Sequence, residues 1–243
     1  MLNGLSQAVF RAPSYPPTPA DERTFDLAGL RLPLRATIAV TVLVLVVILD
    51  FNRTFIPEHL IAYDRNPGMQ RLQAIDRAIL FGLVPLLVIV LAFRDSPSRY
   101  GLRLGEWRVG AGLAAAGCAL MTPIVLWFAA QPDAADYYAP SAASLADVTL
   151  TNLLDLVSAE FLFRGFFMFA MIRVIGPIGV LVATLPFVFS HLTKPELELL
   201  STLGGGLLYG WLAWRTGSVV WGAAAHIYIL TLLIMVAGAS PGG

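Results

Sequence analysis

Side chains that could do acid–base chemistry lie within apolar stretches of the C-terminal half of the chain. Glu160 and Arg164 stand four residues apart, so a helix places them on one face, with the acid first, the order that favours an ion pair. Of the three histidines, His191 ends one apolar run and His226 lies inside another, whereas His59 falls in a polar segment. Together, imidazole and carboxylate groups can activate a water molecule or bind a metal.

The composition indicates that these residues sit in a membrane. Hydrophobic residues make up 57% of the 243 residues and charged residues 13%, and the mean hydropathy is +0.74. A span needs about 20 apolar residues, so the chain has room for six to eight. The formal net charge is zero, which suggests no polyanionic partner such as a nucleic acid. No signal peptide is evident, and the single cysteine, Cys118, excludes a disulfide within the chain.

Seven apolar runs are separated by charged or proline-containing segments, and they cover residues 36–49, 78–93, 109–130, 150–174, 178–190, 203–214 and 219–236. Long apolar segments in lipid are helices, because the backbone must satisfy its own hydrogen bonds. The predicted fold is therefore all-α, a polytopic membrane bundle of about seven (six to eight) transmembrane helices. A Pro- and Arg-containing tail, residues 1–33, precedes a single membrane domain, residues 34–243. We expect loops at residues 51–77 and 131–140, the first with room for an interfacial helix.

The distribution of basic residues predicts the orientation. With the N-terminus inside, ten basic residues fall on the cytoplasmic side and five outside. The inner ten are Arg11, Arg23, Arg31, Arg35, Arg94, Arg99, Arg103, Arg108, Arg173 and Arg215. The absence of a signal peptide and of disulfides fits a bacterial cytoplasmic (inner) membrane.

Three motifs in the C-terminal half occur in a recognisable order. They are EFLFRG at residues 160–165, FVFSH at 187–191, and GGGLLYGWLAWRTGS at 204–218 leading to His226. This region, about residues 147–237, resembles the CAAX-protease and bacteriocin-processing (CPBP, or Abi) family of intramembrane proteins. The resemblance implies a membrane-facing cavity in which Glu160, Arg164, His191 and His226 take the positions of the second glutamate, the arginine and the two histidines.

Two positions depart from the family pattern. Ala159 stands where the family has its first glutamate, the usual general base, and Leu230 stands where it has an asparagine. Glu198 or Asp155 could supply the missing carboxylate. Asp155 lies about 140° around an ideal helix from Glu160, so we favour Glu198, although its charged cluster, residues 194–198, also suits an ordinary interfacial loop.

The resemblance implies an intramembrane endopeptidase that acts on membrane-anchored or prenylated peptides. Glu160 and His191 would polarise a water, His226 would steady the oxyanion, and Arg164 would hold Glu160. The alternative is a catalytically inactive relative that binds another membrane protein or complex, with Glu160 and Arg164 as a structural ion pair. A proton relay is a third reading, but the N-terminal spans have no second set of polar residues to support it.

Cofactors and partners are only partly defined by the sequence. No His-Glu-x-x-His helix is present, so zinc has no ligand motif to support it; if a metal binds, His191, His226 and Glu160 are the residues that would hold it. The expected partners are membrane lipids together with a membrane-anchored peptide or protein substrate, or a larger membrane-protein complex.

Overall fold

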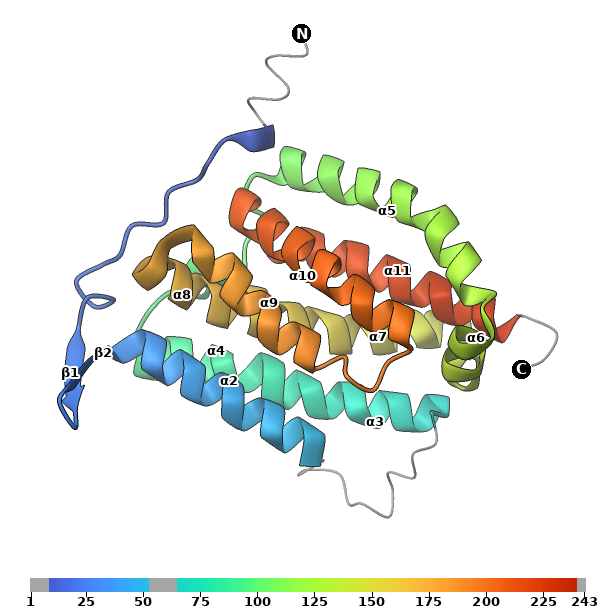
Figure 1. Cartoon of the computed structure of the whole chain (residues 1–243), viewed down its shortest axis with the longest axis horizontal. Helices are drawn as coiled ribbons and strands as arrows, with labels where there is room; N and C mark the ends of the chain where they lie inside the picture. The colour runs from blue at the N-terminus through green and yellow to red at the C-terminus, as the bar shows by residue number, and fades with distance from the viewer. Residues whose placement is uncertain (1–8, 53–64, 240–243) are drawn as a thin grey trace, which may run out of the picture.

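Seven long helical runs make up most of the computed structural model, which describes residues 9–52 and 65–239 (Figure 1). The first two are α2 (Leu34–Asn52) and a continuous rod of α3 (Pro67–Arg77), η2 (Ala78–Leu83), α4 (Val84–Leu87) and η3 (Val88–Ala92). They are followed by η4 (Pro97–Tyr100), α5 (Trp107–Ala129), α6 (Pro132–Tyr138) and η5 (Ala139–Ser141). The C-terminal half contains α7 (Leu145–Glu160), η6 (Phe161–Phe167), α8 (Met168–Ile175), η7 (Gly176–Ile178), α9 (Gly179–Phe189), α10 (Glu196–Thr216) and α11 (Val220–Gly238).

This arrangement confirms the all-α membrane bundle. By length and composition, five helical stretches of the described residues can cross a membrane: Leu34–Phe51, Pro67–Ala92, Trp107–Ala129, Leu145–Phe189 and Val220–Gly238. The 45-residue stretch Leu145–Phe189 reverses at Gly176, whose φ of 68° suits a residue without a side chain, and α9 then packs back against α8. With α10, these stretches give the seven expected runs.

Two segments expected as loops are helical. Residues 67–77 form α3, whose start is fixed by Asn66, because the Asn66 side chain accepts a hydrogen bond from the Met69 amide at 3.0 Å. Residues 132–138 form α6, in which Tyr138 is buried. Both segments are polar in sequence, and their helices lie at one end of the bundle (Figure 1). Residues 53–64 of the first loop, with His59, fall outside the described residues.

The centre of the bundle is the helical run from α7 through η6 to α8. Every residue of η6 is buried, and its phenylalanines pack against α2, η2 and α9. The η6 segment is π-helical and begins directly after Glu160. Short π-helical turns are uncommon and often occur at functional sites. The sequence therefore places its most costly charged residues at the most enclosed and least regular part of the fold.

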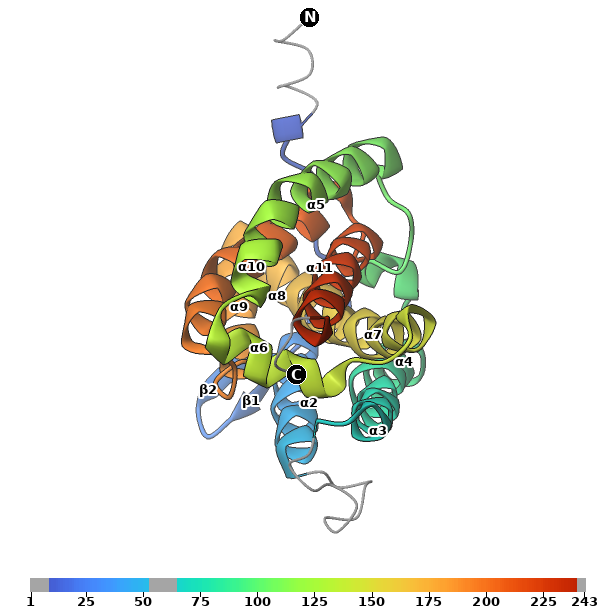
Figure 2. The same ribbon diagram turned by 90° about the vertical axis from the view of Figure 1, so that its right-hand side faces the viewer.

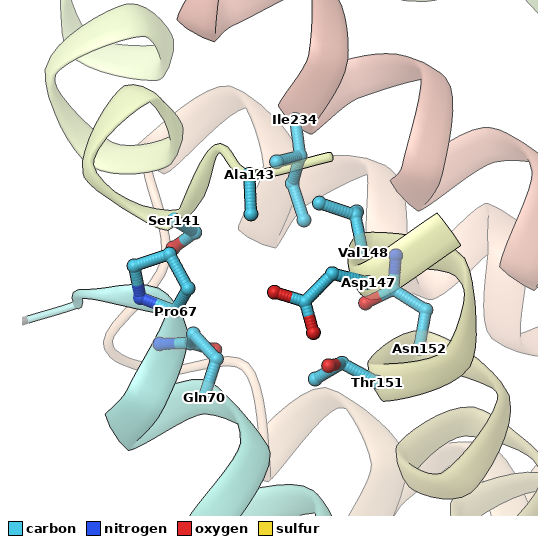
Figure 3. A pocket seen from close by; sticks show the side chains of 9 residues that line it. All are labelled: Pro67, Gln70, Ser141, Ala143, Asp147, Val148, Thr151, Asn152 and Ile234. Carbon is cyan, nitrogen blue, oxygen red and sulfur yellow. The ribbon is translucent and has the colours of Figure 1, made fainter. Parts of the chain in front are cut away.

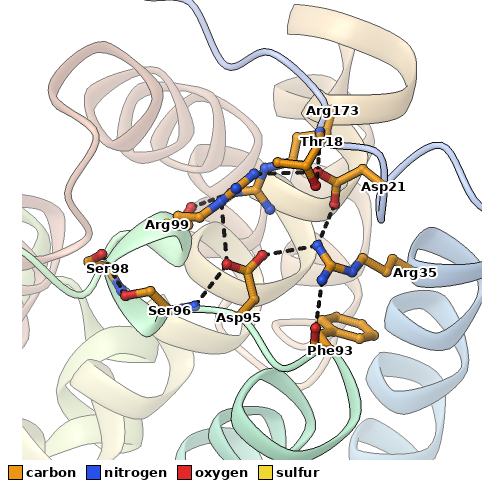
Figure 4. Close-up of polar contacts among 9 residues, drawn as sticks. All are labelled: Thr18, Asp21, Arg35, Phe93, Asp95, Ser96, Ser98, Arg99 and Arg173. Atoms are coloured by element: carbon orange, nitrogen blue, oxygen red, sulfur yellow. Dashed lines mark hydrogen bonds and ion pairs between the residues drawn. The ribbon is translucent and has the colours of Figure 1, made fainter.

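The N-terminal segment packs along the opposite end of the bundle from α6 and includes the hairpin of β1 (Thr24–Leu27) and β2 (Leu30–Pro33). Buried Asp21 accepts hydrogen bonds from Arg35 at 2.8 Å and from Arg99 at 3.3 Å. Arg35 also reaches Asp95 at 3.0 Å, and Arg173 donates to the Arg99 carbonyl oxygen (Figure 4). This network joins the N-terminal segment to α2, η4 and α8.

Candidate active site

Glu160 and Arg164 form a buried ion pair in the middle of the bundle. Arg164 Nη1 lies 3.2 Å from Glu160 Oε1, and both side chains are 1% exposed. Arg164 Nη2 is buried and has no hydrogen-bond partner among the described residues. The guanidinium instead lies over the Phe187 ring, 3.7 Å from its centroid, which is a cation–π contact. The pair therefore keeps one strong donor that the described residues do not use.

His226 completes a three-residue cluster with this pair. Its Nδ1 lies 2.9 Å from Glu160 Oε1, the same oxygen that Arg164 contacts. A carboxylate beside a guanidinium accepts rather than donates, so Nδ1 carries the proton and, in the neutral ring, Nε2 has the free lone pair. The His226 side chain is 14% exposed, against 1% for Glu160. The carboxylate therefore orients an imidazole that is more accessible than itself.

Close helix packing holds this cluster in place. Gly222, one turn before His226 on α11, lies against Glu160: a Cβ there would be 3.6 Å from Oε2. On α10, the Tyr209 ring stacks on His226 with centroids 5.1 Å apart. A Cβ at Gly206 would come within 2.7 Å of Thr184 on α9, so the glycine is needed for α10 to approach α9 this closely. In Figure 2, α11 lies between α7 and α10.

His191 lies at the edge of the cluster and contacts the Phe187 ring. That ring is 4.4 Å from the His191 ring and 6.1 Å from the His226 ring, centroid to centroid. His191 Nδ1 lies 2.9 Å from the Phe187 carbonyl oxygen, which can only accept, so Nε2 again has the lone pair. Burial, and then the Lys194 charge, lower the pKa of His191 to about 3. His191 is therefore a neutral imidazole at physiological pH.

Glu198 belongs to a different group of side chains. Its Oε2 accepts a hydrogen bond from Tyr138 OH at 2.5 Å, and its Oε1 lies 3.5 Å from Lys194 Nζ. Among the described residues it has no hydrogen bond or ion pair with Glu160, His191 or His226. Asp155, the other carboxylate that was considered, pairs with Arg77 at 3.2 Å.

Apolar side chains occupy the two positions that depart from the family pattern. Ala159 packs into the phenylalanine-rich core around η6, and Leu230 packs into a second core cluster formed with α5 and α7. Sequence reasoning did not identify Tyr209 as part of the site. The one feature of the sequence that could have indicated Tyr209 is its position three residues after Gly206, where two helices pack closely.

A small polar cavity lies near the α6 end of the bundle, away from Glu160. Its volume is about 20 Å³, room for about one water molecule, and Asp147, Thr151 and Asn152 of α7 contribute to its lining (Figure 3). Within residues 9–52 and 65–239, no three His, Cys, Asp or Glu side chains are grouped closely enough to hold a metal ion.

Comparison with known proteins supports the resemblance seen in the motifs. Residues 141–232 match the family described as type II CAAX prenyl endopeptidase Rce1-like. This segment contains α7 to α10 and most of α11, and thus every residue of the Glu160 cluster. No curated protein and no solved structure matches the chain significantly.

Proposed function

We propose that the protein is an intramembrane endopeptidase that cleaves membrane-anchored or prenylated peptides, because residues 141–232 match the family described as type II CAAX prenyl endopeptidase Rce1-like. The observation that carries this proposal is the 2.9 Å contact between Glu160 Oε1 and His226 Nδ1. A carboxylate that fixes the tautomer of a histidine is a common way to prepare a general base. In this proposal the Glu160–His226 pair activates the water. In the family this is the role of the first glutamate, which Ala159 replaces here.

The proposed reaction is hydrolysis of a peptide bond. His226 Nε2 accepts a proton from water as the water oxygen bonds to the carbonyl carbon. The proton then passes to the amine nitrogen as the carbon–nitrogen bond breaks, so the products are a new carboxylate and an amine. Glu160 stays ionised and stabilises the imidazolium. His191 provides a second Nε2 lone pair to orient the water.

Arg164 has two roles in this proposal. It holds Glu160 in its ionised form, and its unpartnered Nη2 is available to the carbonyl oxygen, where negative charge develops. The family's asparagine, replaced by Leu230, would otherwise supply that donor. The helices around the cluster expose leucine and other large apolar side chains on their outer faces, so we expect the substrate to arrive from the lipid.

The test is hydrolysis by the full chain reconstituted in liposomes, with a fluorogenic prenylated peptide as the substrate. His226→Gln should lower kcat by about a hundredfold or more, the usual effect of losing a general base. Tyr228→Phe is the matched control, since Tyr228 lies on the same helix but bonds Thr122 of α5 at 2.8 Å, and it should retain activity. Equal activity in wild type and His226→Gln would contradict the mechanism.

A second candidate is a non-catalytic member of the family that binds another membrane protein. Ala159 and Leu230 favour it, because both replace polar family positions with side chains that pack into the core. This reading predicts that folded wild-type protein hydrolyses no membrane-anchored peptide with or without added metal ions. It further predicts that the protein co-purifies with a partner whose association survives Glu160→Gln.

We further propose a bacterial cytoplasmic membrane with the N-terminus inside. Arg35, Arg99 and Arg173 gather at the end of the bundle that holds the N-terminal segment, and this supports the proposal because basic residues favour the cytoplasmic side. In a Cys118→Ser background, a cysteine in place of Ala12 should react with an impermeant maleimide only in inverted vesicles. Labelling from the outside of intact cells would reverse the assignment.

A further inference from the structure

Three side chains link α6 to the turn between α9 and α10. Lys194 Nζ donates to Tyr138 OH at 2.9 Å, and Tyr138 OH donates to Glu198 Oε2 at 2.5 Å. Lys194 also lies 3.5 Å from Glu198 Oε1 and 4.8 Å from the Tyr138 ring centroid. We call Tyr138, Lys194 and Glu198 the clasp. Its members come from segments about 60 residues apart in sequence, so local propensity does not explain it.

Only one assignment of donors and acceptors satisfies the hydrogen bonds of the clasp. Tyr138 has one proton to give, and it gives that proton to the carboxylate, so its oxygen must accept from the ammonium group of Lys194. Burial raises the pKa of the Tyr138 phenol well above its ordinary value, with the Glu198 charge adding to the effect. The hydroxyl therefore keeps its proton, and both of its hydrogen bonds involve a charged partner, which makes them stronger than neutral ones.

The clasp acts on the turn that contains His191. The backbone amide of Lys194 donates to the His191 carbonyl oxygen at 3.0 Å, so the position of Lys194 fixes the backbone of His191. The His191 ring is attached to the end of α9 through its bond to the Phe187 carbonyl oxygen. The turn is short, residues 190–195. Through the clasp, the Lys194 side chain ties this turn to Tyr138 of α6.

We propose that Tyr138 and Lys194 are positioning residues for His191, which they hold beside the Phe187 ring that also contacts His226. This proposal rests on the proposed peptidase function, because His191 has a task only there. It assigns a role to the charged cluster after His191 other than supplying a catalytic carboxylate. Glu198 anchors Tyr138 and Lys194 instead of acting on water.

The test compares two neighbouring tyrosines in the full chain. Tyr138→Phe removes the hydroxyl at the centre of the clasp and keeps the ring. Tyr137→Phe is the matched control, because the Tyr137 hydroxyl has no hydrogen bond among the described residues, although its ring also lies near Lys194. Tyr138→Phe should lower kcat about tenfold or more and change KM less than twofold, since misplacing a catalytic group by a fraction of an ångström costs that much. Tyr137→Phe should change neither.

A second readout does not depend on activity. The chain has only three histidines, so ¹⁵N-histidine labelling gives a small set of imidazole signals that single substitutions can assign. Tyr138→Phe should shift or broaden the His191 signals and leave those of His226 unchanged. If Tyr138→Phe does not fold, Lys194→Gln breaks the clasp at its other end and should give the same result. Unchanged His191 signals in a folded clasp variant would overturn the proposal.

The two readouts separate this inference from the proposed function. If wild-type protein hydrolyses no peptide, the proposed function fails and the role of the clasp in catalysis fails with it, whatever the signals show. If wild type is active and Tyr138→Phe matches it in kcat, only the clasp proposal fails.

Discussion

Two arginine–carboxylate clusters within the bundle differ in how fully their hydrogen bonds are used. Arg77 is held by two carboxylates: Asp50 accepts from it at 3.0 Å through each oxygen, and Asp155 accepts at 3.2 and 3.3 Å. Arg164 has one carboxylate, Glu160, and a buried Nη2 without a partner among the described residues. The Glu160 oxygen that binds Arg164 also accepts from His226.

Under the proposed function, this difference separates a structural ion pair from one that acts in catalysis. Two carboxylates around one guanidinium satisfy a buried charge and tie α2, α3 and α7 together. Where one carboxylate is shared between a guanidinium and an imidazole, the guanidinium keeps a donor for a further hydrogen bond. Stability alone does not require such a spare donor. Buried polar groups with unmet hydrogen bonds are uncommon and often mark sites that act on a ligand.

The largest expected effect is on stability at Arg77. Arg77→Met leaves the Asp50 and Asp155 carboxylates without their shared cation, and breaking a buried pair in this way costs about 3 to 5 kcal/mol. Arg164→Met should cost less, because only one carboxylate loses its cation and His226 still donates to it. Thermal unfolding in detergent measures both. Equal losses of stability would contradict the distinction between the two clusters.

Catalysis should show the opposite pattern. Glu160→Gln keeps the shape of the side chain but loses the charge that fixes the His226 tautomer, so we expect kcat to fall by about 10² to 10⁴. Asp155→Asn is the matched control, a carboxylate–arginine pair on the same helix outside the site, and it should keep kcat within about threefold despite some loss of stability. Comparable loss of kcat in both variants would indicate a general structural effect.

The pH dependence of stability should reveal the buried imidazole of His191. The pKa of His191 is about 3 in the folded chain against an ordinary value of 6.5, so below about pH 6.5 the unfolded chain binds a proton that the folded chain does not. The free energy of unfolding therefore decreases as the pH falls from about 6.5 toward 3. His191 is partly exposed and is faced by Lys194, Arg164 and His226, so we expect on the order of 2 kcal/mol.

Thermal unfolding of wild type and His191→Gln at pH 7.5 and pH 5.0 measures this contribution. The difference between the two proteins isolates His191 from the carboxylates that titrate in the same range. Identical pH dependence in both would show that the imidazole takes up its proton equally in the folded state.

The smallest expected effect is a gain of activity. Ala159→Glu introduces, next to the Glu160 cluster, the glutamate that the CPBP family has at this position, and a second base there should raise kcat/KM about tenfold, or 1.4 kcal/mol of barrier. Ala159→Gln has the same size without the acid and should give no gain. An increase in the glutamine variant would point to packing around η6 and not to base catalysis.

The sequence predicts the membrane bundle and part of the candidate site, for identifiable reasons. Long apolar runs can only be helices in lipid, and the four-residue spacing of Glu160 and Arg164 brings them together within one helical run. The hydropathy pattern does not locate α3 and α6, because both are polar. The side chain of Asn66 caps α3, and α6 begins at Pro132, a residue that suits the first turn of a helix.

Contacts between distant segments could not be predicted from one sequence. His226 meets Glu160 across 66 residues, and Arg77 meets Asp155 across 78. The contact of the Phe187 ring with both histidine rings depends on how closely α10 approaches α9, which Gly206 permits but does not specify. The engagement of Glu198 with Tyr138 likewise depends on α6, which was expected to be a loop.

The most direct test of the account is hydrolysis in ¹⁸O-labelled water. Full-length protein in liposomes is incubated with a membrane-anchored peptide, and the products are analysed by mass spectrometry. The Glu160–His226 mechanism predicts cleavage at a defined bond with one ¹⁸O in the new carboxylate, and a rate of product formation lower by about a hundredfold or more in Glu160→Gln. Folded wild-type protein that yields no labelled product, or Glu160→Gln that yields as much as wild type, would contradict it.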